Sequence, residues 1–130
     1  MLNLILVLTR LQVLTPLWVI IILYLNIRSF RHKLNYIFDN YNDFDVLCFT
    51  ETPLDTQIKD TSLLNQYSDF TLYRKDVSSF FGGVALYVKN SVYSRRRLDL
   101  ELITIQSIWL AVNYVQLRKS GFITRRILIS

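Results

Sequence analysis

Cysteine and histidine are almost absent from the sequence, which limits the chemistry that it can carry. The 130 residues include one cysteine, Cys48, and one histidine, His32. A single cysteine excludes a disulfide bond within the chain, and its place in an apolar run favours a small core residue over a nucleophile. A single histidine excludes any mechanism that needs two histidines from this chain. His32 falls on the polar side of a predicted helix, so we expect a solvated surface side chain.

Long apolar runs are also missing. The uninterrupted apolar stretch at residues 17–25 has nine residues, whereas a helix that crosses a bilayer needs about 20. A secretory signal would require basic residues before such a run and a small-residue cleavage site after it, and neither is clear. The β-branched residues 19–22 favour a strand over a helix. We therefore expect residues 18–25 to form a core strand and residues 1–17 to form an apolar N-terminal extension.

Glycine and proline are scarce too, and no repeat, low-complexity tract or flexible linker appears. Hydrophobic residues make up 52% of the chain and charged residues 19%, a composition that is typical of an ordered protein. The length fits one small domain, which we place at residues 18–130. A net charge of +5 weakly favours a polyanionic partner.

Two predicted strands end in side chains that carry oxygen. Residues 46–49 are four consecutive apolar residues, a pattern that predicts a short strand buried on both faces. This run stops at Glu51, which should face water or a cation because an unpaired buried charge is costly. The strand predicted at residues 18–25 is followed by Asn26.

A helix is predicted between these two strands. Apolar residues recur there at helical spacing and form one stripe, made of Phe30, Leu34, Ile37, Phe38 and Tyr41. A strand–helix–strand unit favours parallel strands with adjacent carboxyl ends. Asn26 and Glu51 would then lie at one rim of the sheet, where their oxygens are the ligand type that a hard metal ion prefers.

The second half of the chain is predicted to be mostly antiparallel. Alternating or apolar segments predict strands at residues 67–74, 84–88, 108–114 and 122–129. Residues 52–66 are polar and should be irregular. The pair Gly82-Gly83 indicates either a bulge or a close backbone approach. The expected fold class is α/β, with one β-α-β unit followed by antiparallel strands.

Four segments in order resemble a known family. They are residues 23–29, 45–52, 82–88 and 108–112. Their succession resembles the N-terminal half of the endonuclease/exonuclease/phosphatase superfamily, and more narrowly the apurinic-endonuclease-like domain of jockey-type non-LTR retrotransposons. Those domains open with a strand that ends in a Leu-Asn-x-Arg-Ser turn, followed by a Leu-x-x-Thr-Glu-Thr strand and a Gly-Gly-Val strand. The resemblance covers residues 18–112 and implies the N-terminal half of a two-sheet α/β sandwich.

The resemblance also implies roles for particular residues. Glu51 corresponds to the glutamate that holds a divalent metal, usually Mg²⁺, and Asn26 to the asparagine that helps to place the metal and the scissile phosphate. Both would be catalytic residues. Arg28 stands where some relatives carry an aspartate, and there it would contact DNA phosphate. Gly82 and Gly83 would let the DNA backbone approach closely.

The same resemblance sets expectations about activity and partners. Relatives continue with a Gly-Asp-x-Asn segment that orients the nucleophilic water and a Ser-Asp-His segment whose histidine stabilises the transition state, and neither occurs here. We therefore expect a truncated metal-dependent DNA endonuclease domain that is inactive alone, so that whether this chain is itself an enzyme stays open. DNA and a reverse transcriptase domain are the implied partners, and a retroelement product would be nuclear or cytoplasmic.

Simpler explanations remain for each of these residues. Glu51 can be a solvated carboxylate at a strand end, Asn26 a turn residue, and the glycine pair an ordinary bulge. The basic residues 95–97, together with Lys89, fit a solvated charge cluster better than a DNA contact.

A second hypothesis concerns the whole chain. The apolar residues 1–25, followed by Arg28, Arg31 and Lys33, resemble a membrane anchor with a basic stop, which would make this a small non-catalytic membrane-anchored protein. We do not favour it. If residues 18–25 pair as a strand with residues 46–49, a spanning helix over that segment is excluded.

Overall fold

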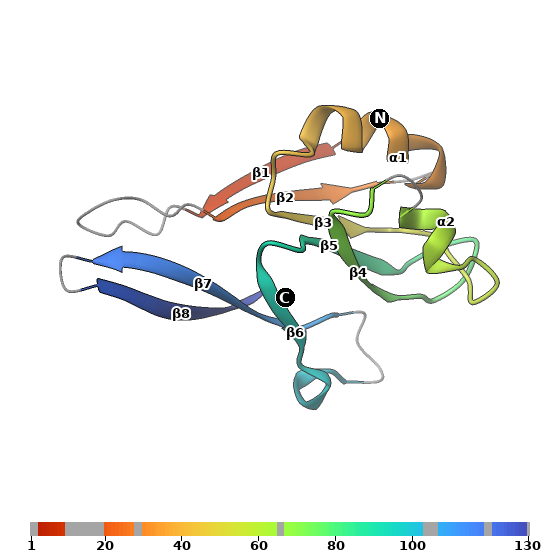
Figure 1. Cartoon of the computed structure of the whole chain (residues 1–130). Helices are drawn as coiled ribbons and strands as arrows, with labels where there is room; N and C mark the ends of the chain where they lie inside the picture. The colour runs from red at the N-terminus through yellow and green to blue at the C-terminus, as the bar shows by residue number, and fades with distance from the viewer. Residues whose placement is uncertain are drawn as a thin grey trace.

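The chain folds into two β-sheets with few helices. The computed structural model describes residues 3–9, 20–27, 30–64, 67–102, 107–118 and 121–129. The arrangement is mixed α/β, with a five-stranded sheet of order β1-β2-β3-β5-β4 and a three-stranded sheet of order β6-β7-β8 (Figure 1). In chain order the elements are β1 (Asn3–Thr9), β2 (Ile20–Asn26), α1 (Phe30–Tyr41), β3 (Val46–Thr50), α2 (Asp60–Leu64), β4 (Phe70–Lys75), β5 (Val84–Lys89), β6 (Tyr93–Arg96), the 3₁₀ helix η1 (Leu98–Leu100), β7 (Leu110–Arg118) and β8 (Gly121–Ile129).

β2, α1 and β3 form the predicted β-α-β unit. β2 and β3 are parallel, with paired residues running from Ile22 opposite Val46 to Asn26 opposite Thr50. The predicted stripe of α1 is buried in the core, and its fully buried members are Phe30, Leu34, Ile37 and Phe38. Because the two strands run in the same direction and pair to their ends, their carboxyl ends meet at one rim of the sheet.

Strands β2 to β5 of the five-stranded sheet are covered on both faces. On one face, Leu47 and Phe49 of β3 pack with the α1 stripe. On the other face, Val46 and Cys48 pack with buried residues at the start of β7, so the helices and the three-stranded sheet lie on opposite sides of the larger sheet (Figure 1). β3 is therefore buried on both faces, as predicted. Burial raises the pKa of the Cys48 thiol to about 12, which makes it an unreactive core residue, also as predicted.

The remaining strands are antiparallel, as the sequence predicts. β6 is an additional strand, at residues for which no strand was predicted. β5 pairs with β3 on one side and with β4 on the other, and β7 pairs with β6 and β8. The alternation of β4 is reproduced, because Phe70 and Leu72 pack in the helix-side core while Tyr73 packs on the opposite face. The order β3-β5-β4 places the glycine pair that precedes β5 beside the end of β3.

The N-terminal residues differ from the prediction. The sequence places residues 1–17 outside the domain, but Asn3–Thr9 form β1, an antiparallel partner of β2. A short continuous apolar run fits an edge strand as well as an anchor, so its pattern alone could not separate them. β2 also pairs with β3, the outcome that excludes a spanning helix over Ile20–Asn26. No helix in the described part of the chain is long and apolar enough to cross a membrane. The start of the predicted strand, at residues 18 and 19, lies outside the described residues.

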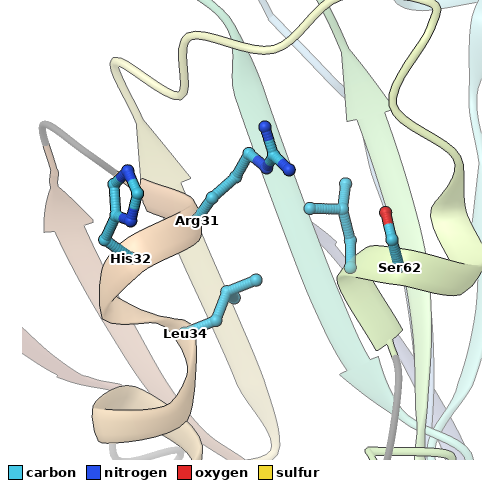
Figure 2. A pocket seen from close by; sticks show the side chains of 5 residues that line it. Arg31, His32, Leu34 and Ser62 are labelled. Atoms are coloured by element: carbon cyan, nitrogen blue, oxygen red, sulfur yellow. The ribbon is translucent and has the colours of Figure 1, made fainter.

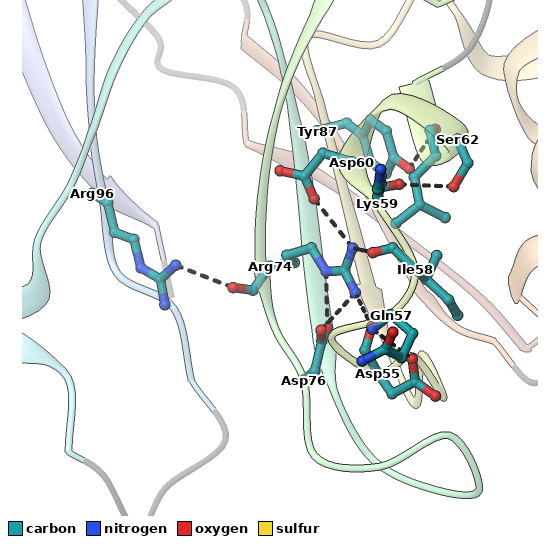
Figure 3. A network of polar contacts seen from close by, with 11 residues as sticks. Asp55, Gln57, Ile58, Lys59, Asp60, Ser62, Arg74, Asp76, Tyr87 and Arg96 are labelled. Carbon is teal, nitrogen blue, oxygen red and sulfur yellow. Dashed lines mark hydrogen bonds and ion pairs between the residues drawn. The ribbon is translucent and has the colours of Figure 1, made fainter.

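The segment between β3 and β4 is more ordered than its polar sequence indicates. The sequence predicts an irregular segment at residues 52–66, whereas Asp60–Leu64 form the short helix α2, whose Leu63 is buried. The Tyr87 hydroxyl donates a hydrogen bond of 2.9 Å to the Leu63 carbonyl. Arg74 of β4 binds the same segment through several acceptors (Figure 3). The residues that follow Glu51 are therefore held against β4 and β5.

Candidate metal and phosphate site

Asn26 and Glu51 lie at the same rim of the five-stranded sheet. Asn26 is the last residue of β2 and pairs with Thr50, the last residue of β3, so Glu51 follows directly beyond its partner. The Ile27 N–H extends this pairing by donating a hydrogen bond of 2.9 Å to the Thr50 carbonyl. Both Asn26 and Glu51 are exposed. The rim therefore presents one amide and one carboxylate side by side in the strand order, as the β-α-β prediction requires.

The backbone of Glu51 has an unusual conformation. Its φ is 57°, and among the described residues it is the one residue other than glycine with a positive φ. The left-handed region costs an L-residue with a Cβ roughly 1–2 kcal/mol. Such strain persists where the surrounding structure determines it, and it gathers at functional sites. Here it occurs at an exposed carboxylate that directly follows a strand whose first four residues are buried.

Gly82 holds the Glu51 carboxylate. The Gly82 N–H donates a hydrogen bond of 3.3 Å to Glu51 Oε2, and both glycines of the pair are buried with φ of 72° and 97°. These positive values favour glycine, because a residue with a Cβ would be strained at both positions. The glycine pair thus reaches the candidate site from the loop between β4 and β5.

A close contact with Thr52 explains why the second residue of the pair, Gly83, is a glycine. A Cβ placed on Gly83 would lie 2.4 Å from the Thr52 carbonyl oxygen and 2.9 Å from Thr52 Oγ1. The Thr52 N–H in turn donates a hydrogen bond of 3.4 Å to the Gly83 carbonyl. The close backbone approach that the sequence offered as one alternative is observed, and its partner is Thr52. The expected contact of both glycines with DNA stays a prediction.

The two threonines beside Glu51 are in different environments. Thr50 Oγ1 lies 3.1 Å from the Tyr24 hydroxyl, so it has a partner on β2. Thr52 is completely buried, and its Oγ1 has no hydrogen-bond partner among the described residues. A buried hydroxyl without a partner is uncommon in proteins. It marks this strand end as a place where packing against Gly83 prevails over hydrogen bonding.

Asn26 and Glu51 are residue types that bind Mg²⁺ in proteins, although they are only two. Mg²⁺ prefers oxygen ligands and retains several waters, and it needs only one or two protein carboxylates besides substrate phosphate. Asn26 and Glu51 offer one amide oxygen and one carboxylate. No group of three or more histidine, cysteine, aspartate or glutamate side chains suited to a metal occurs in the described part of the chain. Of the two residues that the sequence assigns to this rim, Glu51 is the one that would supply a carboxylate to a metal.

Two of the other basic residues named from the sequence, Arg96 and Arg97, have acidic partners in the chain. Arg28 lies outside the described residues. Arg96 forms two hydrogen bonds of 2.8 Å with the Glu101 carboxylate, and Arg97 forms bonds of 2.8 and 2.6 Å with Asp99. Arg96 and Arg97 thus have acidic partners within the chain, which agrees with the interpretation of residues 95–97 as a charge cluster.

A cavity of about 250 Å³ lies between α1 and α2. Its lining is shown in Figure 2 and consists of Arg31, His32, Leu34, Ser62 and Leu63. His32 is exposed at its edge, as predicted for a surface side chain. The lining includes neither Asn26 nor Glu51, so this cavity is separate from the candidate site.

One feature beside the rim was missed by the sequence prediction. The loop that precedes Gly82 ends in Phe80 and Phe81, both strongly exposed. Two aromatic residues in a predicted loop, directly before a glycine pair, were a signal that could have marked this segment.

Comparison of the chain with protein family models, with curated proteins and with solved structures finds no match.

Proposed function

We propose that this chain supplies the metal-holding half of a Mg²⁺-dependent DNA endonuclease domain of the endonuclease/exonuclease/phosphatase type, as found in jockey-type retroelements. One observation carries the proposal: three motifs from separate parts of the sequence meet at one rim. The β2–β3 register aligns Asn26 with the residue before Glu51, and the Gly82 N–H bonds to the Glu51 carboxylate. The parallel pairing of β2 and β3 brings Asn26 and Glu51 together, and the position of β5 beside β3 adds the glycine pair.

The architecture also supports this proposal, although less specifically than the site does. A β-α-β unit, antiparallel strands beside it and a second sheet on the opposite face are the parts expected for the N-terminal half of a two-sheet α/β sandwich. Many functions share such layered folds, so the argument depends on the site rather than on the fold.

The rim offers the oxygen ligands that a metal ion in phosphodiester cleavage would need. Glu51 and Asn26 would hold Mg²⁺ by their oxygens. When bound, Mg²⁺ stabilises negative charge on the phosphate and lowers the pKa of a coordinated water. The left-handed backbone of Glu51 and the Gly82 N–H hold the carboxylate at the strand end, so little rearrangement is required for it to act as a ligand.

The segments that would orient the attacking water and stabilise the transition state do not occur in the 130 residues. We therefore expect this chain to bind a divalent metal without cleaving DNA by itself. DNA is the proposed partner of an intact domain, and a reverse transcriptase domain is the proposed neighbour in a full-length element.

Direct metal binding tests this proposal. We expect the chain to bind one Mn²⁺, used as a paramagnetic substitute for Mg²⁺, and we expect Glu51→Gln to abolish this binding in an electron paramagnetic resonance titration. Asp43→Asn is the matched control, because Asp43 is an exposed carboxylate that precedes β3 rather than following it. Equal binding by wild type and Glu51→Gln, or no binding by the wild type, would contradict the proposal.

A nicking assay tests the expected inactivity. Supercoiled plasmid incubated with the chain and Mg²⁺ should remain uncut. Nicking that Glu51→Ala abolishes would support the endonuclease role of the rim and would show that the expectation of inactivity is wrong.

A further inference from the structure

Two phenylalanine rings project into solvent beside the candidate site. Phe80 is 89% exposed and Phe81 is 62% exposed. Neither residue belongs to the two hydrophobic clusters, and no ring contact is found for either in the described part of the chain. Single exposed aromatic residues are ordinary on protein surfaces, whereas two adjacent exposed rings offer an apolar surface that a ligand can use.

The loop holds these rings in a defined arrangement. The N–H groups of Phe80 and Phe81 donate hydrogen bonds of 3.2 and 3.1 Å to Ser78 Oγ. The Ser78 hydroxyl donates one of 3.2 Å to the Phe81 carbonyl. The backbone of the loop is thus closed on the Ser78 side chain, while both rings stay outside. Binding through these rings would require little ordering of the loop, which reduces its entropic cost.

The loop is continuous with the metal rim. Phe81 directly precedes Gly82, whose N–H bonds to Glu51 Oε2 at 3.3 Å, and Gly83 packs against Thr52. The connection between β4 and β5 leaves the sheet at the end where β2 and β3 finish (Figure 1). A molecule held at Glu51 would therefore lie beside the loop that carries the two rings.

We propose that Phe80 and Phe81 stack against bases of single-stranded DNA that passes beside the rim formed by Asn26 and Glu51. This rests on the proposed function of that rim. Each ring offers a flat apolar face, and every base has a face that can stack on it, so the contact would carry little sequence preference. The net charge of +5 favours a polyanion over an apolar peptide as the occupant.

Equilibrium binding of a fluorescein-labelled single-stranded oligonucleotide to the full chain tests this proposal. Anisotropy is measured at low salt in EDTA, so the result does not depend on whether Glu51 holds a metal. We expect Phe80→Ala/Phe81→Ala to bind at least about tenfold more weakly than wild type, a loss that corresponds to one stacked base. A matched oligonucleotide of abasic residues, which retains the phosphates, should bind wild type and this variant equally.

Two further variants make the result specific. Tyr93→Ala removes an aromatic ring that is also 62% exposed, but on β6, and it should leave oligonucleotide binding unchanged. Phe80→Trp/Phe81→Trp retains two stacking faces and should bind as wild type does. Because all measurements are made without metal, a failure of Mn²⁺ binding at Glu51 would count against the proposed function alone.

Several outcomes would overturn the stacking proposal. One is equal oligonucleotide binding by wild type and the double alanine variant. Another is an equal loss of binding to the abasic oligonucleotide, which would indicate a backbone rather than a base contact. A third is that the alanine variant changes only binding to phosphatidylcholine–phosphatidylserine vesicles, or only self-association in sedimentation velocity, because the rings would then serve a membrane or a protein.

Discussion

At the scale of single residues, Glu51 combines exposure with strain. Its left-handed φ of 57° is a conformation that glycine adopts easily and glutamate does not. The Gly82 N–H bond of 3.3 Å is long and offsets only part of this cost. Glycine would suit the backbone at this position better, and the proposed metal site gives a reason for the glutamate.

We therefore expect Glu51→Gly to stabilise the fold and remove the function. Relief of the backbone strain should exceed the cost of the extra chain entropy of glycine. We therefore expect the free energy of unfolding, measured by urea denaturation, to rise by about 0.5 kcal/mol. The same variant should not bind Mn²⁺. Asp43→Gly is the control, because Asp43 has no positive φ and this change should lower stability. A clear loss of stability in Glu51→Gly would contradict the argument from strain.

At the scale of elements, Arg74 joins the segment after β3 to β4. Its guanidinium donates to the carbonyls of Asp55 and Ile58 at 2.9 and 2.6 Å, and it pairs with Asp60 and Asp76 at 3.1 and 2.6 Å (Figure 3). Burial opposes its charge, but the hydrogen bonds and charges of Asp76 and Asp60 outweigh burial and raise the pKa of Arg74. The network fixes a segment whose polar composition predicts no regular structure.

Removal of the guanidinium should loosen this segment. Arg74→Met is expected to lower the free energy of unfolding by about 3 kcal/mol, because two carbonyls and the Asp76 carboxylate lose their donor at a site where the Arg74 side chain is only 12% exposed. Arg74→Lys should recover part of this loss, since an ammonium group cannot reach all four acceptors at once. Urea denaturation measures both. Arg97→Met, at an exposed pair, should cause no measurable change.

The elements differ in how well sequence patterns predict them. The β-α-β unit follows from local signals, namely the apolar run of β3 and the helical stripe of α1, and the shared rim of Asn26 and Glu51 follows from it. α2 gave no signal, because five residues with one buried side chain carry no periodicity. β1 was missed because residues 10–19 contain no short hairpin turn pattern that would link it to β2.

The meeting of Gly82 with Glu51 could not be predicted for a different reason. It depends on β5, rather than β4, lying next to β3. Strand order beyond a local hairpin is set by long-range packing, which leaves no trace in the spacing of residues. The two exposed phenylalanines were visible in the sequence, but their exposure is a property of the folded loop.

At the scale of the whole molecule, Arg96 links the two sheets. It lies on β6 of the smaller sheet, and its guanidinium donates a bond of 3.1 Å to the Arg74 carbonyl on the larger sheet. It also binds the Glu101 carboxylate, whose side chain is 6% exposed. The hydrogen bonds from Arg96 lower the pKa of Glu101 despite its burial. The contact between the sheets, formed by Arg96 with the Arg74 carbonyl and Glu101, therefore contains an ionised carboxylate.

This contact between the sheets should make the folding stability of the chain depend on pH. Because the pKa of Glu101 is lower in the folded state, its contribution is fully present above its unfolded pKa of about 4.3 and is lost as pH falls through the folded value. We expect Glu101→Gln to be less stable than wild type at pH 7, with a difference that disappears in acid. Thermal unfolding across this range measures it.

The candidate site is assembled from segments that leave the ribosome at different times. Asn26 and Glu51 can align as soon as β2, α1 and β3 have emerged and paired. Gly82, the donor to the Glu51 carboxylate, lies 31 residues further along the chain. At roughly 5–20 residues per second, translation supplies it about 2–6 s later. During that interval a nascent chain would display the carboxylate before the loop that restrains it has been made.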